Sequence, residues 1–192
     1  MAAGTQRDKI VRAAADLFRR KGYAGTGLND VVTESGAPKG SLYYYFPGGK
    51  EELGAEAVRF AGARVANTLK TLAAEHIHAG DLVRAYAQLL AGWMTKSSFR
   101  DGCPITTTLL ETVPGSSSIA GAGCDAFASW TRILSDALIR DGVDRNEAQR
   151  LARFAISALE GALITARTEV SDDIIIEIGI TLQRLFLDAV RR

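Results

Sequence analysis

The strongest constraint on the fold comes from residues 26–46, where a helix break separates two short helical patterns. Leu28 and Val31 place apolar side chains on one face of a first helix, and Thr26 is a suitable N-cap because its hydroxyl can accept an N–H of the first turn. The sequence Ser-Gly-Ala-Pro at residues 35–38 ends this helix, since Gly allows a left-handed residue and Pro suits the first turn of the next helix. The pattern predicts two short helices joined by a tight turn.

The second of these helices has two different faces. Leu42 and Phe46 are one turn apart, so both point to the same side and can pack inward. The side chains left to face outward are those of Lys39, Gly40, Ser41, Tyr43, Tyr44 and Tyr45. A short helix-turn-helix whose second helix presents a lysine, a glycine and tyrosines is typical of an element that reads DNA.

These residues belong to a longer set of positions at fixed offsets within residues 6–55. The set comprises Gly22, Tyr23, Thr26, Val31, Val32, Gly36 and the runs 39–46 and 50–53. In this order and spacing they resemble the N-terminal signature of the TetR/AcrR family of transcriptional regulators. Residues 47–50 (Pro-Gly-Gly-Lys) form a longer spacer than that signature has, and with Gly-Cys-Pro-Ile at residues 102–105 they are similar to the LmrA/YxaF-like branch.

The rest of the sequence indicates an all-α fold. Of the 192 residues 47% are hydrophobic and 23% charged, alanine is abundant, and the alternation typical of strands is nearly absent. We predict an N-terminal three-helix helix-turn-helix DNA-binding domain at residues 1–50 and, as the resemblance implies, a C-terminal helical domain for effector binding and dimerisation at residues 51–192. Further helices are expected at residues 5–21, 50–76, 82–93, 105–111, 119–140, 145–168 and 172–190.

The net charge of +1 conceals a basic N-terminal end. Residues 1–50 carry eight Lys or Arg against four Asp or Glu, which leaves 15 against 18 for the rest. This balance suits an anionic partner such as the DNA backbone, although an ordinary solvated surface can show it too. No apolar run reaches about 18 residues and the N-terminus lacks the apolar region of a signal peptide, so we expect no membrane segment and a cytoplasmic location.

The last two expected helices carry more apolar surface than one chain readily buries. A seam of mostly small residues runs along residues 145–168, and isoleucines and leucines cover more than one side of residues 172–190. A helix that is apolar nearly all round is buried on both sides, and a second subunit is the simplest second surface. We predict a four-helix homodimer interface, as the resemblance also implies; the alternative is the core helix of a monomer.

The helix-turn-helix residues divide by the kind of DNA contact that each can make. Lys39, Gly40 and Tyr45 are assigned to base edges or their vicinity, because Lys donates to guanine acceptors and Gly allows close approach. The residues assigned to phosphates are Thr26, Ser41, Tyr43, Tyr44 and Lys50. The alternative for each tyrosine is packing on the surface of its own domain.

A repressor is released from DNA by a ligand with different affinities for two arrangements of the dimer. The candidate ligand-binding residues are Trp93, Phe99, Thr107, Leu110, Glu111, Phe127, Trp130 and Phe154. They combine apolar and aromatic side chains with few polar groups, which favours a small hydrophobic effector. Ordinary core packing is the alternative for each of them.

The two cysteines admit other functions. Cys103 precedes Pro104 at an expected helix start, but neither histidine has a spacing that points to it, and no phosphate loop or metal motif occurs. We therefore predict no enzyme activity, no catalytic residue, no metal and no cofactor. The preferred interpretation is a transcriptional repressor that binds a palindromic double-stranded DNA operator as a dimer. A thiol-based redox-sensing regulator using Cys103 or Cys124 is the alternative function, and a helical interaction protein without DNA is a third.

Overall fold

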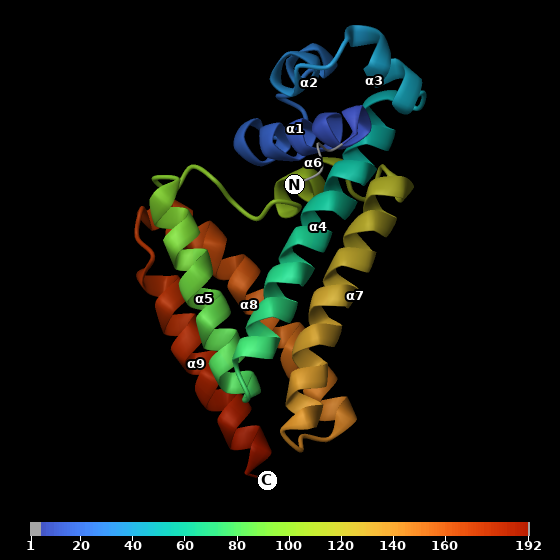
Figure 1. The fold of residues 1–192 in the computed structure, drawn as a ribbon. Coiled ribbons are helices and arrows are strands. Elements are labelled where there is room, and N and C mark those ends of the chain that lie inside the picture. The colour runs from blue at the N-terminus through green and yellow to red at the C-terminus, as the bar shows by residue number, and fades with distance from the viewer. Residues whose placement is uncertain (1–4, 192) are drawn as a thin grey trace. The chain divides into compact units, whose positions relative to one another are not determined.

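The computed structural model describes residues 5–191, and these contain nine α-helices and no strand (Figure 1). The helices are α1 (Gln6–Lys21), α2 (Leu28–Ser35), α3 (Lys39–Tyr45), α4 (Gly49–Glu75), α5 (Ala79–Lys96), α6 (Thr106–Thr112), α7 (Ser117–Arg140), α8 (Arg145–Glu169) and α9 (Asp173–Val190). The predicted all-α fold is confirmed. Within the described residues, no helix has the length and apolar character needed to cross a membrane.

The predicted cap of α2 is wrong by one residue. Gly27 is the N-cap, and its N–H donates to Asp30 Oδ2 at 2.9 Å. The Thr26 hydroxyl instead donates to the Gly22 carbonyl at 2.8 Å, and Thr26 is fully buried. A buried hydroxyl needs a partner, and the Gly22 carbonyl supplies one within the loop, so the Thr26 hydroxyl does not cap α2.

The break between α2 and α3 follows the prediction. Gly36 ends α2 with φ of 64°, in the left-handed region that a residue without a Cβ adopts at little cost. Pro38 directly precedes α3, where its missing N–H leaves no hydrogen bond unmade. Both predicted inward residues of α3, Leu42 and Phe46, are fully buried.

Two later helices begin at residues other than those expected. Helix α5 starts at Ala79 rather than after Asp81, because the Ala79 N–H donates to Asp141 Oδ2 at 2.6 Å, from a residue far along the chain. The N-cap position of α9 is Asp172, where the sequence predicts the first helical residue, and the hydroxyl of the preceding Ser171 accepts the Asp173 N–H at 3.2 Å.

The chain packs as two compact units. Unit 1 comprises Met1–Ala63 and Cys103–Ala126, and unit 2 comprises Arg64–Gly102 and Phe127–Arg192. Helices α4 and α7 each contribute residues to both units. The predicted division at residue 50 concerns function and stays a prediction, whereas packing places α6 and the start of α7 in the same unit as the helix-turn-helix.

Unit 1 has a hydrophobic core on which the helix-turn-helix rests. Helix α1 contacts α2, α3 and α6. The largest fully buried side chains of this core are Ile10, Phe18, Leu42, Phe46 and Leu53. Burial of each side chain stabilises the folded state by about 1.5–3 kcal/mol. Packing against α1 therefore stabilises α2 and α3, which are too short to be stable as isolated helices.

In unit 2, α5 and α9 lie side by side (Figure 1). Their backbones approach closely at Gly179, where a Cβ would lie 2.6 Å from the Ala87 Cβ. Polar contacts fix the same pair, because Gln183 Nε2 donates to Asp81 Oδ1 at 2.8 Å and Arg84 donates to Gln183 Oε1 at 3.0 Å.

Candidate nucleic-acid interface

The outward face of α3 has the composition that the sequence predicts. Lys39 and Gly40 are exposed, and Tyr43 and Tyr44 leave 52% and 79% of their surface accessible. A Cβ built on Gly40 would meet nothing within 4 Å, so none of residues 5–191 fills the space in front of it. This leaves the backbone open to close approach by a large polar partner.

Ser41 and Tyr45 of α3 are less accessible than Tyr43 and Tyr44. Tyr45 is half-buried, packs against the unit 1 core, and meets the Tyr44 ring edge-on with centroids 5.1 Å apart. The alternative considered for each tyrosine is packing on the surface of its own domain. Tyr45 packs in this way over part of its ring, whereas Tyr44 does not.

Thr26 lies in the loop between α1 and α2, and Lys50 of α4 contacts the same loop. The Thr26 hydroxyl is buried and engaged with Gly22, so its predicted phosphate contact has no exposed hydroxyl to support it. The Lys50 Nζ lies 3.5 Å from the Ala24 carbonyl oxygen and 4.5 Å from the Tyr23 ring centroid. These two contacts hold the Lys50 ammonium group beside residues 23 and 24 of the loop between α1 and α2. Burial, and then the negative charge of Glu51, raise the pKa of Tyr23, so this ring stays a neutral platform.

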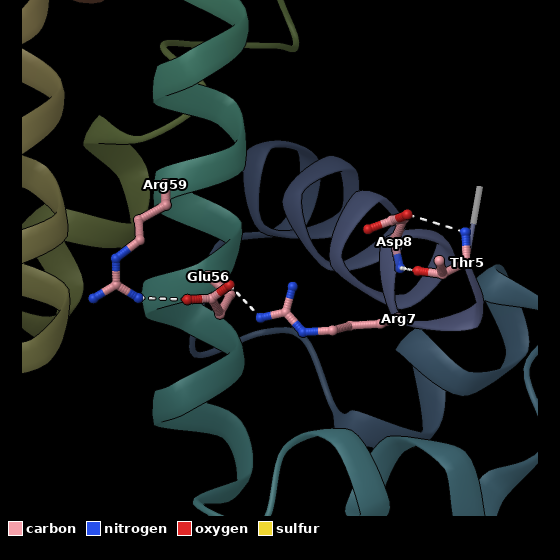
Figure 2. A network of polar contacts seen from close by, with 5 residues as sticks. All are labelled: Thr5, Arg7, Asp8, Glu56 and Arg59. Atoms are coloured by element: carbon pink, nitrogen blue, oxygen red, sulfur yellow. Dashed lines mark hydrogen bonds and ion pairs between the residues drawn. The ribbon is translucent and has the colours of Figure 1, made fainter. Parts of the chain in front are cut away.

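An ion-pair network joins the first turn of α1 to α4 (Figure 2). The Glu56 carboxylate accepts hydrogen bonds from Arg7 and, at 2.6 Å, from Arg59. Burial alone would raise the Glu56 pKa, but the hydrogen bonds and positive charges of the two arginines lower it below its ordinary value of 4.5. Arg7 also lies over the Phe46 ring, 5.4 Å from its centroid, which connects the network to the last residue of the α3 core.

Replacing Glu56 by glutamine is expected to lower the free energy of unfolding at pH 7 by about 1 kcal/mol, because a partly exposed carboxylate loses two charged partners. A lowered folded-state pKa stabilises above the unfolded pKa, and this contribution is lost as pH falls through the folded value. Urea unfolding from pH 7 downwards should therefore show the two proteins converging below pH 4.5. Asp125→Asn, at an exposed carboxylate of the same unit, controls for loss of charge, and parallel curves would contradict the network.

Two carboxylates that sequence reasoning did not assign to unit 1 hold its segments together. Glu51 Oε1 accepts hydrogen bonds from Ser116 at 2.5 Å and Ser118 at 3.1 Å, and these lower the Glu51 pKa. Glu111 Oε2 accepts the Ala24 N–H at 2.6 Å. Neither contact has a local signal, because the partners are 65 to 87 residues apart in the chain.

The predicted ligand-binding residues are not brought together as one set. Phe127 and Trp130 are in contact, edge-on with ring centroids 5.2 Å apart, and Trp130 is buried. The exposed members are Trp93, Leu110, Glu111 and Phe154. The members on α6 belong to unit 1, and the aromatic members belong to unit 2. A site formed by this set stays a prediction, and its best-supported part is the Phe127–Trp130 pair.

The two cysteines differ in exposure. Cys103, in the segment before α6, is buried, whereas Cys124 on α7 is exposed. Thiol oxidation requires access to solvent, so any redox role would fall on Cys124 first.

An exposed lysine-and-tyrosine face on a short second helix, supported by a buried three-helix core, defines a helix-turn-helix DNA-binding protein. Residues 10–57 match the family described as bacterial regulatory proteins, tetR family. Residues 79–179 match the LmrA/YxaF-like C-terminal domain of transcriptional regulators. The chain belongs to the TetR family of DNA-binding transcriptional regulators, with a C-terminal domain of the LmrA/YxaF type.

Individual relatives agree with this assignment. The uncharacterized HTH-type transcriptional regulator YxaF of Bacillus subtilis (strain 168) is 33% identical over 165 residues, which are 86% of each chain. The HTH-type transcriptional regulator LmrA of the same strain is 32% identical over 168 residues, 88% of this chain and 89% of LmrA. A cysteine mutant of the TetR family regulator CifR, solved with 26 base pairs of double-strand operator DNA, has a TM-score of 0.76 at 20% identity and covers 96% of this chain and 98% of CifR. At that identity the likeness to CifR is one of fold.

Proposed function

We propose that this regulator is a cytoplasmic repressor that binds a palindromic operator as a homodimer and is released by a small hydrophobic ligand. The observation that carries the proposal is the outward face of α3, where lysine, glycine and tyrosine side chains are exposed above buried Leu42 and Phe46. Such a helix fits the DNA major groove, and two copies related by a dimer axis meet half-sites about 34–36 Å apart. CifR, which has the same fold, was solved with operator DNA, and this supports DNA binding by the present chain.

The residues of the helix-turn-helix would then divide between bases and backbone. Lys39 and Gly40 lie at the N-terminal end of α3, the end from which a recognition helix contacts base edges. Tyr45, the last residue of the helix, is also assigned to base edges or their vicinity. Tyr43 and Tyr44 have exposed side chains and suit phosphate contacts, as do Ser41 and Lys50.

The dimer contact is proposed to use the outer faces of α8 and α9. In one protomer Phe154, Ile164 and Leu185 are exposed large apolar side chains on these two helices. Gly161 lies between the first two, and a Cβ built on it would meet nothing within 4 Å. A small residue flanked by exposed apolar ones permits close approach of a second helix, which supports a self-complementary pairing.

The effector is proposed to be small and hydrophobic because the predicted ligand-binding residues are mostly apolar and aromatic, and two of them, Phe127 and Trp130, pack edge-on against each other. A compound of this kind releases DNA only if it binds the DNA-free arrangement more tightly than the DNA-bound one. Thermal-shift screening of small apolar compounds, with release of bound DNA as the second readout, tests this part. A compound that stabilises the protein without altering DNA binding would contradict the effector role.

DNA specificity is tested by selecting duplexes from a random-sequence pool with the full chain, followed by gel shifts with competitor DNA. We expect enrichment of an inverted repeat, a dimer-to-duplex stoichiometry, and an affinity that exceeds non-specific binding by about a thousandfold or more. Binding that stays sequence-independent at moderate salt would overturn the proposal, because electrostatics alone produces that behaviour.

Replacing Lys39 by alanine is expected to weaken binding to the selected operator by about 1–3 kcal/mol and to relax the base preference at one position of each half-site. The physical reason is loss of a charged donor at the exposed N-terminal end of α3. Gel shifts on operators substituted at each position measure both effects.

The matched control is Tyr43→Phe, which removes only the phenolic hydroxyl of an exposed α3 residue. It should lower affinity evenly across all operator variants, since a phosphate contact carries no base information. A selective loss at one base pair in Tyr43→Phe, or an even loss in Lys39→Ala, would contradict the assigned roles.

A further inference from the structure

The loop between α1 and α2 is held by two charged side chains that engage one residue. The Ala24 N–H donates to Glu111 Oε2 of α6 at 2.6 Å. On the other side of the same residue, Lys50 Nζ of α4 lies 3.5 Å from the Ala24 carbonyl oxygen. The backbone of Ala24 therefore connects a carboxylate of α6 to the lysine that is assigned to a DNA phosphate. All three residues belong to unit 1.

Gly22 shows how closely the Glu111 carboxylate approaches this loop. Its φ of 81° is in the region that residues with a Cβ rarely adopt. A Cβ built there would lie 2.5 Å from Glu111 Oε1, a separation that would force the carboxylate to move. Glu111 Oε1 thus lies beside Gly22, while Oε2 accepts the Ala24 N–H. Helix α6, which carries Glu111, also contacts α1.

We infer that Glu111 is a positioning residue for DNA binding, which acts through Ala24 on Lys50. By holding the Ala24 N–H, Glu111 fixes the orientation of the peptide groups whose carbonyl lies beside the Lys50 ammonium. This inference rests on the proposed phosphate contact of Lys50 and goes beyond it, because Glu111 was expected to touch a ligand rather than to serve the DNA-binding loop.

Electrostatics alone predicts the opposite effect of Glu111. The Glu111 carboxylate is on the same unit as the DNA-binding helix and repels DNA phosphates. On this ground alone, removing it should strengthen DNA binding. A positioning role predicts weaker binding on removal, because Lys50 and the loop lose a fixed arrangement. The sign of the change in affinity therefore separates the two explanations.

The experiment compares Glu111→Ala with Glu111→Gln, in which the amide oxygen can still accept the Ala24 N–H. On the operator selected by the wild-type chain, we expect Glu111→Ala to weaken binding roughly five- to tenfold and to reduce the slope of log K against log salt by about one. Glu111→Gln should stay within about twofold of wild type, since the acceptor is kept. Asp125→Ala removes an exposed carboxylate of the same unit and should not weaken binding.

A double-mutant cycle tests whether Glu111 acts through Lys50. In a Lys50→Ala background, Glu111→Ala should add no further loss, because the group that it positions is already absent. Hydrogen exchange in the free protein gives a second readout, in which the Ala24 amide should exchange faster in Glu111→Ala than in wild type or Glu111→Gln.

Three results would overturn the inference: unchanged or tighter binding in Glu111→Ala, equal losses in Glu111→Ala and Glu111→Gln, or full additivity with Lys50→Ala. Failure of the proposed function is distinguishable from all three, because it appears as wild-type protein that selects no operator. The hydrogen-exchange comparison still decides whether Glu111 orders Ala24 in that case.

Discussion

Replacing Phe46 by alanine is expected to destabilise the helix-turn-helix more than any other single truncation in it, by about 3–5 kcal/mol. Phe46 is fully buried at the end of α3, and Arg7 lies over its ring. Removing the ring leaves a cavity in the hydrophobic core of unit 1 and also removes the cation–π contact. Such a loss is comparable to the entire stability of a small domain.

The measurement is denaturant unfolding followed by hydrogen exchange of unit 1 amides, together with operator binding. Phe46→Leu keeps most of the apolar volume and should cost about 1.5 kcal/mol or less. Tyr44→Ala on the same helix is the opposite control, because this side chain is exposed: stability should change by less than about 0.5 kcal/mol while DNA affinity falls. An unfolding midpoint of Phe46→Ala equal to that of wild type would show that the α3 core is not assembled in this way.

Replacing Ala158 by glutamate is expected to convert the proposed dimer to monomers. Ala158 is a half-buried small residue of α8, one turn from exposed Phe154 and from Gly161. At a two-fold interface each substitution places two new carboxylates in one buried patch, where desolvation and mutual repulsion cost several kcal/mol. Operator affinity should fall by about a hundredfold or more, because each monomer can occupy only one half-site.

Analytical ultracentrifugation across a concentration series measures the change directly. Ala128→Glu is a matched control, since it introduces the same side chain at an exposed alanine of α7. It should leave the dimer intact. A dimeric Ala158→Glu protein would move the interface away from α8, whereas a monomeric wild type would remove the dimer from the proposal altogether.

Some features of the helix-turn-helix could be predicted from local sequence, because residues close together in the chain determine them. Gly36 and Pro38 end one helix and start the next because of their own backbone preferences, which operate in any context. Leu42 and Phe46 share a face by helical spacing, so their burial and the exposure of Tyr43 and Tyr44 follow from the period alone. The all-α fold follows from the same periodicity over the remaining chain.

Prediction failed where a polar group had a choice of partners. Thr26 is an ordinary helix cap by sequence, yet its buried hydroxyl donates to the Gly22 carbonyl in the folded loop. The ligand contact of Glu111 stays a prediction, and the folded chain adds contacts of its carboxylate with Gly22 and Ala24 that no local pattern indicates. The type of a residue tells which hydrogen bonds its side chain can make. Which donor or acceptor it actually meets depends on the segments that folding brings next to it.

Short-range spacing along the chain is enough to predict the helical class, the break between α2 and α3, the exposed Lys39, Tyr43 and Tyr44 of α3, and the family. Contacts between distant segments required the folded chain: Glu56 joins Arg7 to Arg59, Glu51 binds Ser116 and Ser118, and Glu111 accepts the Ala24 N–H. The physical reason is that a hydrogen bond acts over about 3 Å and depends on direction, so it forms only after packing has brought distant segments together.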